Sequence, residues 1–522
     1  MRARLPWIGF LLLAICGLAA WRAACVIAGP DIDTDAYAHH MIARAILADP
    51  RDLAVHWVWL PLFHYVQVPL VALGGTMQEV RWANVGLSAA LPIVLFAYVL
   101  RTTRSYAGAR RGTPMPAEAT ALLAALFSAM SPIAMQMGTT AQPEPLFALL
   151  ILLVAIAFEN RSYAAAALLL GAAVMLRYEA WAVLAIAASV LAFDLAFDPS
   201  HGRGGVSRWA IVALPVTLIV GWAALRRPVD GQWFGFLRQT HDFANDALHE
   251  KTLHRGAFAL LKDALYYPLA VPVRVLGPAM LVAPFGVVRT VREQGARFVL
   301  VFAACLGFVS LTWAVHASLG LDRHFVCIVP LYATFAAQGI AAIAEGASRL
   351  ASRFARGARR FGAVAGAALA LLSVGGLAIE LSLWMADWRA SIERGWPDRM
   401  ALGAYLRGLP ERSVIFCDDA TLEILSGLDR RRFDRHWVDD PHTWDLVADA
   451  ARRHGVAYVA TWRRKLLGHD RASAGRRDSP REESALLAQT VGSPGVSGAL
   501  VFRAGFEAPQ EDTTGVAVMR VP

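Results

Sequence analysis

Apolar segments of bilayer-spanning length recur along most of this chain, and no other feature of the sequence restricts its fold as strongly. A transmembrane helix needs about 20 apolar residues because the hydrocarbon core of a bilayer is about 30 Å thick. The chain is therefore predicted to be an α-helical multi-pass membrane protein with about eleven transmembrane helices. The predicted windows are 6–28, 82–100, 117–136, 145–158, 163–176, 180–197, 208–225, 272–288, 297–315, 325–345 and 361–384.

The residue composition agrees with a membrane protein and excludes several other classes. The chain is 57% hydrophobic and 17% charged, which is too apolar for an ordinary soluble protein of this size. Its net charge of +9 comes almost wholly from arginine, a bias typical of a GC-rich bacterial genome. No basic stripe with interleaved aromatic residues is present, so a nucleic-acid partner is not expected.

Arginine clusters fall in alternate joints between the windows, and this alternation predicts the orientation of the chain. Short cytoplasmic loops retain arginine, whereas translocated loops do not. The amino terminus is therefore predicted to be cytoplasmic, in the inner membrane of a bacterium, with segments 30–81, 138–144, 177–179, 226–271, 316–324 and everything after 385 outside. The arginine-bearing joints contain Arg2 and Arg4; Arg101, Arg104, Arg110 and Arg111; Arg161; Arg203 and Arg208; Arg289, Arg292 and Arg297; and Arg349, Arg353, Arg356, Arg359 and Arg360.

The composition changes after Trp388 to a charged, mixed sequence. Short β-like runs at 413–417, 457–461, 499–504 and 516–521 alternate with helical stretches, and residues 468–482 are predicted to form a loop. We therefore expect two domains. Residues 1–388 form a transmembrane catalytic domain with a first outer loop at 29–81, and residues 389–522 form a small extracytoplasmic α/β domain.

The first outer loop begins with an acidic run that contains Asp31, Asp33 and Asp35. Carboxylates this close repel one another, and that repulsion favours proton uptake by at least one of them. The run is therefore a candidate general base. The alternative is a solvated acidic loop that only marks the translocated side.

Further ionisable residues lie in the other outer joints, where charge near a span is a functional-site hypothesis by default. The first loop continues through His39 to an aromatic stretch that ends at His64. Glu144 opens one window, and Arg177 and Glu179 lie between two others. A charge at the centre of a transmembrane helix costs about 2.5–3.5 kcal/mol, so these three residues should face a polar cavity or each other. An internal pair between Arg177 and Glu179 is the simpler alternative.

Arg323 and His324 lie at the outer end of a late window. A guanidinium and an imidazole in a low-dielectric setting can bind a phosphate through charge-assisted hydrogen bonds. The alternative for Arg323 is an arginine that extends to the membrane interface. The sequence contains no phosphate-binding GxxxxGK loop, GxSxG elbow, CxxC pair or HExxH helix, so nucleotide-dependent, serine-hydrolase and zinc-protease chemistry lack their usual residues.

Taken in order along residues 1–385, these motifs resemble the GT-C superfamily of glycosyltransferases that use polyprenyl-phosphate sugars. The chain resembles especially the branch that contains the protein O-mannosyltransferases and the lipid A aminoarabinose transferase. The similarity rests on Asp33-Thr-Asp35-Ala-Tyr37, Trp59-Leu-Pro61-Leu-Phe-His64, Arg81-Trp-Ala-Asn84, Glu144-Pro145, Arg177-Tyr-Glu179 and Arg323-His324 before Pro330.

The resemblance implies a role for each matching position. Asp33 or Asp35 would be the catalytic base. Asp33 is preferred because the acidic residue of the family usually stands about four positions before the tyrosine that Tyr37 matches. Arg323 and His324 would bind the donor phosphate. The substrate pocket would contain Tyr37, His39, His64, Glu144, Arg177 and Glu179, and no residue is assigned to a metal. Some branches of the family need a divalent cation and others do not.

The expected reaction is transfer of a sugar from a polyprenyl-phosphate donor in the membrane to an acceptor hydroxyl at the outer face. In-line displacement by the acceptor predicts inversion at the anomeric carbon. The acceptor could be a protein, a glycan or a lipid. The competing hypothesis is a transporter or flippase of a lipid-linked sugar, but transporters commonly show paired repeats, and none is visible here.

Overall fold

The computed structural model describes residues 5–108, 114–197, 206–252, 257–352, 358–395, 397–417, 420–434, 452–453, 455–462, 500–504 and 516–520. The chain divides into two compact units. Unit 1 comprises Met1–Pro30 and Arg51–Ile392, and unit 2 comprises Asp31–Pro50 and Glu393–Pro522. The second unit is thus built from two stretches of chain that the whole of the larger unit separates in sequence.

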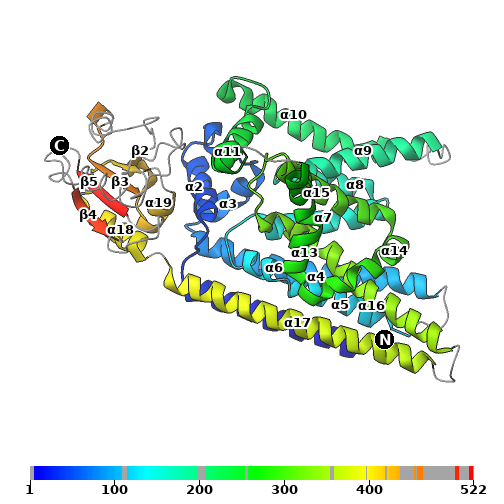
Figure 1. Ribbon diagram of the computed structural model, residues 1–522. Coiled ribbons are helices and arrows are strands. Elements are labelled where there is room, and N and C mark those ends of the chain that lie inside the picture. Colours follow the sequence, from blue (N-terminus) through cyan, green and yellow to red (C-terminus); the bar gives the residue numbers. More distant parts are fainter. Residues whose placement is uncertain are drawn as a thin grey trace. The chain divides into compact units, whose positions relative to one another are not determined.

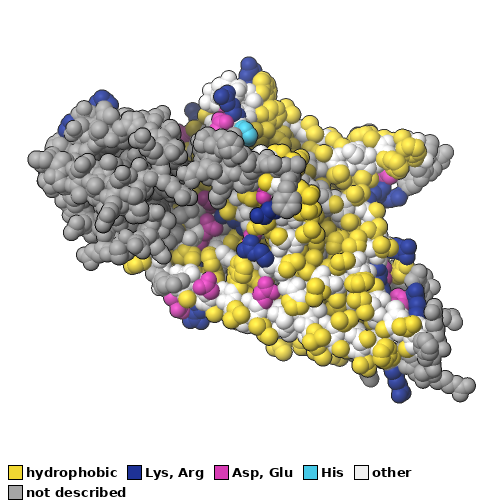
Figure 2. Space-filling view, viewed as in Figure 1, with side chains coloured by type: hydrophobic (Ala, Val, Ile, Leu, Met, Phe, Trp, Pro, Cys, Tyr) yellow, Lys and Arg dark blue, Asp and Glu magenta, His cyan; other side chains and the backbone are white. Residues whose placement is uncertain are grey.

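Unit 1 is a helical bundle (Figure 1). In the part of the chain that the structure describes, eight helices are long and apolar enough to cross a membrane. Hydrophobic side chains cover the visible face of the bundle, with Lys and Arg side chains at its right-hand end (Figure 2). The helices are α1 (Leu5–Ala28), α3 (Leu62–Ala72), α4 (Met77–Gly108), α5 (Ala117–Ala129), α6 (Pro132–Met137), α7 (Glu144–Glu159), α8 (Tyr163–Val174), α9 (Glu179–Phe197), α10 (Ala210–Asp230), α11 (Gly235–Thr252), α12 (Ala257–Leu265), α13 (Val271–Leu276), α14 (Ala283–Gln294), α15 (Ala296–Ala314), α16 (Val329–Ser352) and α17 (Ala358–Arg394), with short 3₁₀ turns η2 (Leu53–His56), η4 (Val206–Trp209) and η7 (Asp322–Ile328).

Three of the eleven predicted windows form helices shorter than a bilayer span. They correspond to α5, α7 and α8, which contain 13, 16 and 12 residues. At about 1.5 Å per residue, such helices rise only about 18–24 Å. Most residues of α5 and α7 and half of those of α8 are buried. For α7 and α8 the predicted windows 145–158 and 163–176 were already shorter than the roughly 20 residues of a perpendicular span. The window 117–136 did not reveal that α5 ends at Ala129, because a helix covered by its neighbours is as apolar as one that faces lipid.

The predicted window 272–288 is wrong as a continuous helix. The spanning segment here is Ala259–Leu281, so it starts inside the predicted outer loop 226–271. A π-helical turn η5 (Tyr266–Ala270), helix α13 and a 3₁₀ turn η6 (Gly277–Leu281) interrupt it. Prolines remove backbone donors at 268, 272 and 278, and Gly277 adopts a φ of +49° that ends α13.

Several joints of unit 1 meet at each end of α7. At one end Arg101 donates to Asn160 Oδ1 at 2.6 Å, and the backbone N–H of Phe298 donates to Glu159 at 3.2 Å. Arg297 also pairs with Asp194 there. At the other end of α7, the predicted outer joints 138–144, 177–179 and 316–324 meet around Arg177.

Unit 2 contains α2 (Thr34–Ala48), α18 (Pro397–Arg407), α19 (Ala420–Ser426), the 3₁₀ turn η8 (Arg430–Arg432) and a mixed five-stranded sheet of order β2-β1-β3-β5-β4. All four predicted β-like runs form strands: β1 (Ile415–Cys417), β3 (Tyr458–Trp462), β4 (Leu500–Ala504) and β5 (Val516–Arg520). The fifth strand, β2 (Phe433–Asp434), was not predicted because two residues show no periodicity. The core joins α18, α19 and the sheet through Leu402, Leu406, Ile415, Leu422 and Val518. The predicted loop 468–482 lies outside the described residues.

Candidate functional site

The clearest polar cluster in unit 1 surrounds Arg177, in the joint between α8 and α9. Its Nη1 donates to Glu144 Oε1 at 2.6 Å, and its Nη2 donates to Glu179 Oε1 at 2.9 Å. Burial opposes the charge of Arg177, but Glu179 and Glu144 together outweigh that effect, so the pKa of Arg177 lies above its ordinary value. The internal pair between Arg177 and Glu179, the simpler alternative from the sequence, is therefore present, and Glu144 is a second partner of Arg177.

The local sequence explains why both carboxylates point into this cluster. Glu144 and Glu179 are the first residues of α7 and α9, where a helix carries a partial positive charge that favours an acidic side chain. Pro145 lies in the first turn of α7, where the missing N–H costs no helical hydrogen bond. Glu144 and Glu179 are almost fully buried.

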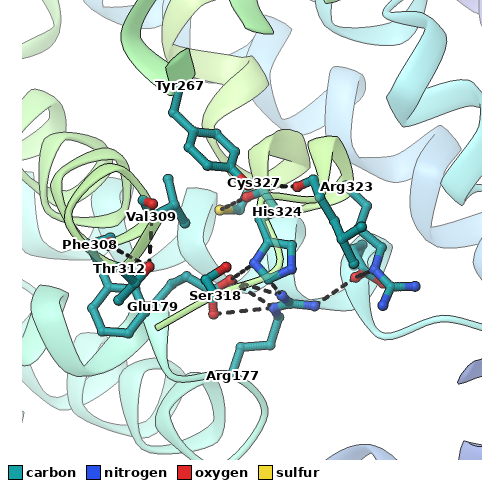
Figure 3. Close-up of polar contacts among 12 residues, drawn as sticks. Arg177, Glu179, Tyr267, Phe308, Val309, Thr312, Ser318, Arg323, His324 and Cys327 are labelled. Atoms are coloured by element: carbon teal, nitrogen blue, oxygen red, sulfur yellow. Dashed lines mark hydrogen bonds and ion pairs between the residues drawn. The ribbon is translucent and has the colours of Figure 1, made fainter. Parts of the chain in front are cut away.

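The turn η7 brings Arg323 and His324 to the same cluster. Arg323 Nε lies 3.6 Å from Glu144 Oε1. His324 Nδ1 lies 3.3 Å from both Arg177 Nη2 and Glu179 Oε1. Arg177 lies between Glu179 and Arg323 in Figure 3, with the ring of His324 directed toward it. Five of the predicted site residues therefore meet, although the chain separates them by up to 180 positions.

Tyr266, Tyr267 and Arg274, which were not predicted as site residues, hold the start of η7 in place. Asp322 accepts from Tyr266 Oη at 2.6 Å and pairs with Arg274 Nη1 at 2.9 Å. The Tyr267 hydroxyl donates to the carbonyl of Leu321 at 2.9 Å. An acidic residue directly before Arg323 was the only sequence signal for this arrangement, since no pattern links it to the two tyrosines.

Buried side chains of α4 hold the segment that leads to Glu144. Arg81 Nε donates to Thr139 O at 2.7 Å and Arg81 Nη1 to Gly29 O at 2.6 Å, just beyond the end of α1. Asn84 Nδ2 donates to Thr140 O and Gln142 O, each at 2.7 Å. These bonds satisfy carbonyls that have no helical partner. The Arg81-Trp-Ala-Asn84 motif therefore supports the start of α7.

His64, predicted as a pocket residue, forms a pair with His56 in unit 1. Their Nδ1 atoms lie 2.8 Å apart, so one ring donates and the other accepts. Both side chains are fully buried. Burial, followed by the charge of Arg226, lowers the pKa of His56 to about 3. Arg226 is itself buried, pairs with Asp230 at 2.6 Å and donates to Leu53 O at 2.9 Å, which explains why an arginine is tolerated in a predicted outer loop.

The acidic run and its neighbours belong to unit 2. Asp33 caps α2, and its Oδ1 accepts from the N–H of Asp35 at 3.0 Å. Asp31 Oδ1 accepts from the N–H of Asp33 at 3.0 Å, and the Tyr37 hydroxyl donates to the Asp31 carbonyl at 2.9 Å. Tyr37 and His39 are buried on α2. The predicted meeting of the aspartates with Arg323 stays a prediction.

No group of three or more His, Cys, Asp or Glu side chains suited to a metal ion occurs in the described parts of either unit.

Comparisons with known proteins identify similar structures but no similar sequence. No protein-family model matches the chain, and no curated protein matches it. The crystal structure of ArnT from Cupriavidus metallidurans bound to undecaprenyl phosphate matches with a TM-score of 0.55 at 13% identity, over 98% of both chains. The apo crystal structure of the Archaeoglobus fulgidus oligosaccharyltransferase matches with a TM-score of 0.54 at 10% identity, over 94% of this chain and 73% of the other. At these identities the likeness shows a shared fold, and it confirms the predicted multi-pass architecture.

Proposed function

We propose that this chain, which has the GT-C fold, is a membrane glycosyltransferase that moves a sugar from a polyprenyl-phosphate donor to an acceptor hydroxyl. One observation carries the proposal: Arg177, Arg323 and His324, which are half-buried, meet the buried Glu144 and Glu179 in one cluster at one end of the bundle. Charged groups near the membrane interior are costly, and they are retained where they bind or react. The similar ArnT structure contains undecaprenyl phosphate.

The charges in the cluster favour Arg323 and His324 as the donor-phosphate contacts. Arg177 donates to both carboxylates, at 2.6 Å and 2.9 Å, and Arg323 Nε lies 3.6 Å from Glu144 Oε1. The two guanidinium and two carboxylate charges balance one another, and His324 Nδ1 lies beside Glu179. Arg323 would bind the phosphate through a charge-assisted hydrogen bond, and the His324 ring would donate an N–H to it.

The proposed reaction is a single displacement at the anomeric carbon. The acceptor oxygen forms a bond to this carbon as the bond to the phosphate oxygen breaks, and the polyprenyl phosphate leaves with the electron pair. Asp33, or Asp35 in its place, takes the acceptor proton, a contribution typically of about 10² to 10⁴ in rate. Arg323 and His324 stabilise the charge that grows on the leaving phosphate. The product has inverted configuration.

Glu144 is proposed to contact the sugar of the donor. Its Oε1 is engaged by Arg177, while its Oε2 is buried and has no hydrogen-bond partner among the residues that the structure describes. A buried carboxylate oxygen without a donor is costly, and a sugar hydroxyl would satisfy it. Tyr37, His39 and His64 complete the proposed pocket.

The proposed location is the inner membrane of a bacterium, with a cytoplasmic amino terminus. The end of unit 1 where the arginine-rich joints meet would face the cytoplasm, and the Arg177 cluster would lie toward the outer side. The acceptor would approach from that outer side as a protein, glycan or lipid, and the donor from the membrane.

Sugar transfer by the purified full-length chain in detergent tests the proposal. A panel of labelled undecaprenyl-phosphate sugars is incubated with a membrane extract as the acceptor source, and the anomeric configuration of the product is determined. Loss of transfer in Asp33→Asn or Asp35→Asn, together with weaker undecaprenyl-phosphate binding in Arg323→Ala, would support it. Unchanged transfer in both aspartate variants would refute the base assignment. Passage of an intact lipid-linked sugar across liposomes without bond cleavage would instead indicate a transporter.

A further inference from the structure

Helix α2, which follows directly on the acidic run, is packed against the carboxy-terminal part of the chain within unit 2. It lies beside α19 (Figure 1). Residues 31–50 group with 393–522, although they stand between α1 and α3 in sequence. The helix that carries the proposed base is thus anchored by residues almost 400 positions further along the chain.

Arg44 makes the polar contacts of this packing. Its Nη2 donates to Leu428 O at 2.9 Å, and its Nη1 lies 3.9 Å from Glu423 Oε1. Leu428 comes directly after Gly427, the first residue beyond α19. Gly427 has a φ of +65°, so the chain turns away from the helix at this point. Glu423 is 1% exposed, so the ion pair lies in a setting where solvent screens it little.

The partner helix is itself well fixed in the domain. Leu422 of α19 belongs to the core of unit 2. Arg407 of α18 donates to Leu425 O at 2.9 Å and to Ser426 O at 3.3 Å, so it satisfies carbonyls at the end of α19 that have no helical partner. The surface that receives Arg44 is therefore rigid.

The acidic run is in turn rigidly joined to α2. Asp33 is the N-cap of the helix, and the Tyr37 hydroxyl ties the Asp31 carbonyl to its first turns. Arg44 stands 11 residues after Asp33 on the same uninterrupted helix. Any tilt of α2 at Arg44 therefore moves the carboxylates at the other end of the helix.

We propose that the carboxy-terminal domain positions the acidic loop for catalysis, with Arg44 as the positioning residue that holds α2 on α19. This inference rests on the proposed function, because it takes Asp33 or Asp35 as the base. The domain would then be required for turnover without touching substrate. Donor binding, which is assigned to Arg323 and His324 of unit 1, would not depend on it.

The test compares Arg44→Ala, Arg44→Lys and Glu423→Gln in the full-length chain, with Arg431→Ala as the control. Arg431 is an exposed arginine of the same domain. Amide hydrogen exchange of residues 34–48 reports the hold on α2, and sugar transfer gives kcat and the donor KM. We expect Arg44→Ala to exchange faster and to lose about 10- to 100-fold in kcat, since a misplacement near 1 Å can cost that much. The KM for the donor should stay within about twofold of the wild-type value, because the residues that bind the donor are unchanged.

The conservative variants keep the proposal testable if Arg44→Ala fails to fold. Arg44→Lys retains one donor for Leu428 O and should recover part of the protection and turnover, and Glu423→Gln, at 3.9 Å, should have a smaller effect. The proposal would be overturned if residues 34–48 of a folded Arg44 variant exchanged their amide hydrogens at the wild-type rate. It would also be overturned if Arg431→Ala lost as much kcat as Arg44→Ala. Wild-type activity in both Asp33→Asn and Asp35→Asn would overturn the base assignment instead, and the exchange result would still decide whether Arg44 holds α2.

Discussion

Arg177 donates to Glu144 across 33 positions of the chain and to Glu179 two positions away, so one guanidinium serves the first residues of two helices. Its side chain is 14% exposed and those of the two carboxylates are 3% and 4% exposed. Removing one partner of such a group leaves the other charges buried without compensation. This destabilises a protein more than replacing the whole group by uncharged residues does.

Arg177→Met should therefore destabilise unit 1 by about 3–5 kcal/mol, seen as a lower midpoint of thermal unfolding in detergent. Arg238→Met is the matched control, because Arg238 is 73% exposed and its pair with Asp242 is 3.7 Å long. The control should melt like the wild type. A triple variant that also carries Glu144→Gln and Glu179→Gln should regain much of the loss, and failure to regain any would argue against uncompensated charge as the cause.

Asp322→Ala should weaken undecaprenyl-phosphate binding although Asp322 is not assigned to the phosphate. Its carboxylate joins Tyr266 and Arg274, so its loss removes two anchors of the turn that carries Arg323 and His324. Loss of such charge-assisted hydrogen bonds costs about 1.5–3 kcal/mol, or on the order of 10- to 100-fold in affinity. Binding of labelled undecaprenyl phosphate to the purified protein measures it. Asp242→Ala, at an exposed pair, serves as control, and equal affinities in the two variants would contradict the anchoring role.

The sequence predicted the members of the Arg177 cluster for a physical reason that needs no knowledge of the fold. A charge beside a membrane span must find a partner or a polar cavity, so residues such as Glu144 and Glu179 stand out from the apolar windows around them. The arginine alternation then placed their joints on one side. Both arguments depend only on residue type and order.

The contacts that the sequence missed depend on long-range packing. Nothing near His56 shows that its ring meets His64 at 2.8 Å, and nothing near Arg44 points to Leu428. The prediction of a continuous helix over 272–288 was wrong. The prolines in this segment did not argue against a helix, because transmembrane helices tolerate proline where neighbouring groups satisfy the freed carbonyls. In this segment the chain instead breaks at Gly277.

The buried histidine pair predicts a pH dependence of stability. The folded-state pKa of His56 is about 3, below the value of about 6.5 expected for an unfolded chain. Between these values the unfolded state binds more protons, so stability is lost as pH falls from about 6.5 toward 3, by up to about 1.4 kcal/mol per pH unit for one group. His56→Asn, which can keep a polar contact to His64, should show a flatter fall of melting temperature with pH. If the melting temperatures of the wild type and His56→Asn fell in parallel with pH, His56 would be excluded as the source of the pH dependence.

Gly339 should be intolerant of a side chain, whereas Gly346 on the same helix should accept one. A Cβ on Gly339 would lie 1.9 Å from the carbonyl oxygen of Val282, so α14 and α16 would have to move apart. Such overpacking typically costs about 1–3 kcal/mol.

Gly346 has no atom within 4 Å of the corresponding position, and alanine there should stabilise the helix by about 0.5–1 kcal/mol. We therefore expect Gly339→Ala to lower the midpoint of thermal unfolding in detergent and Gly346→Ala to raise it slightly. Because both changes add the same methyl group to α16, helix propensity cannot produce opposite signs. Equal shifts in the two variants would mean that close approach of α14 and α16 does not limit the stability of unit 1.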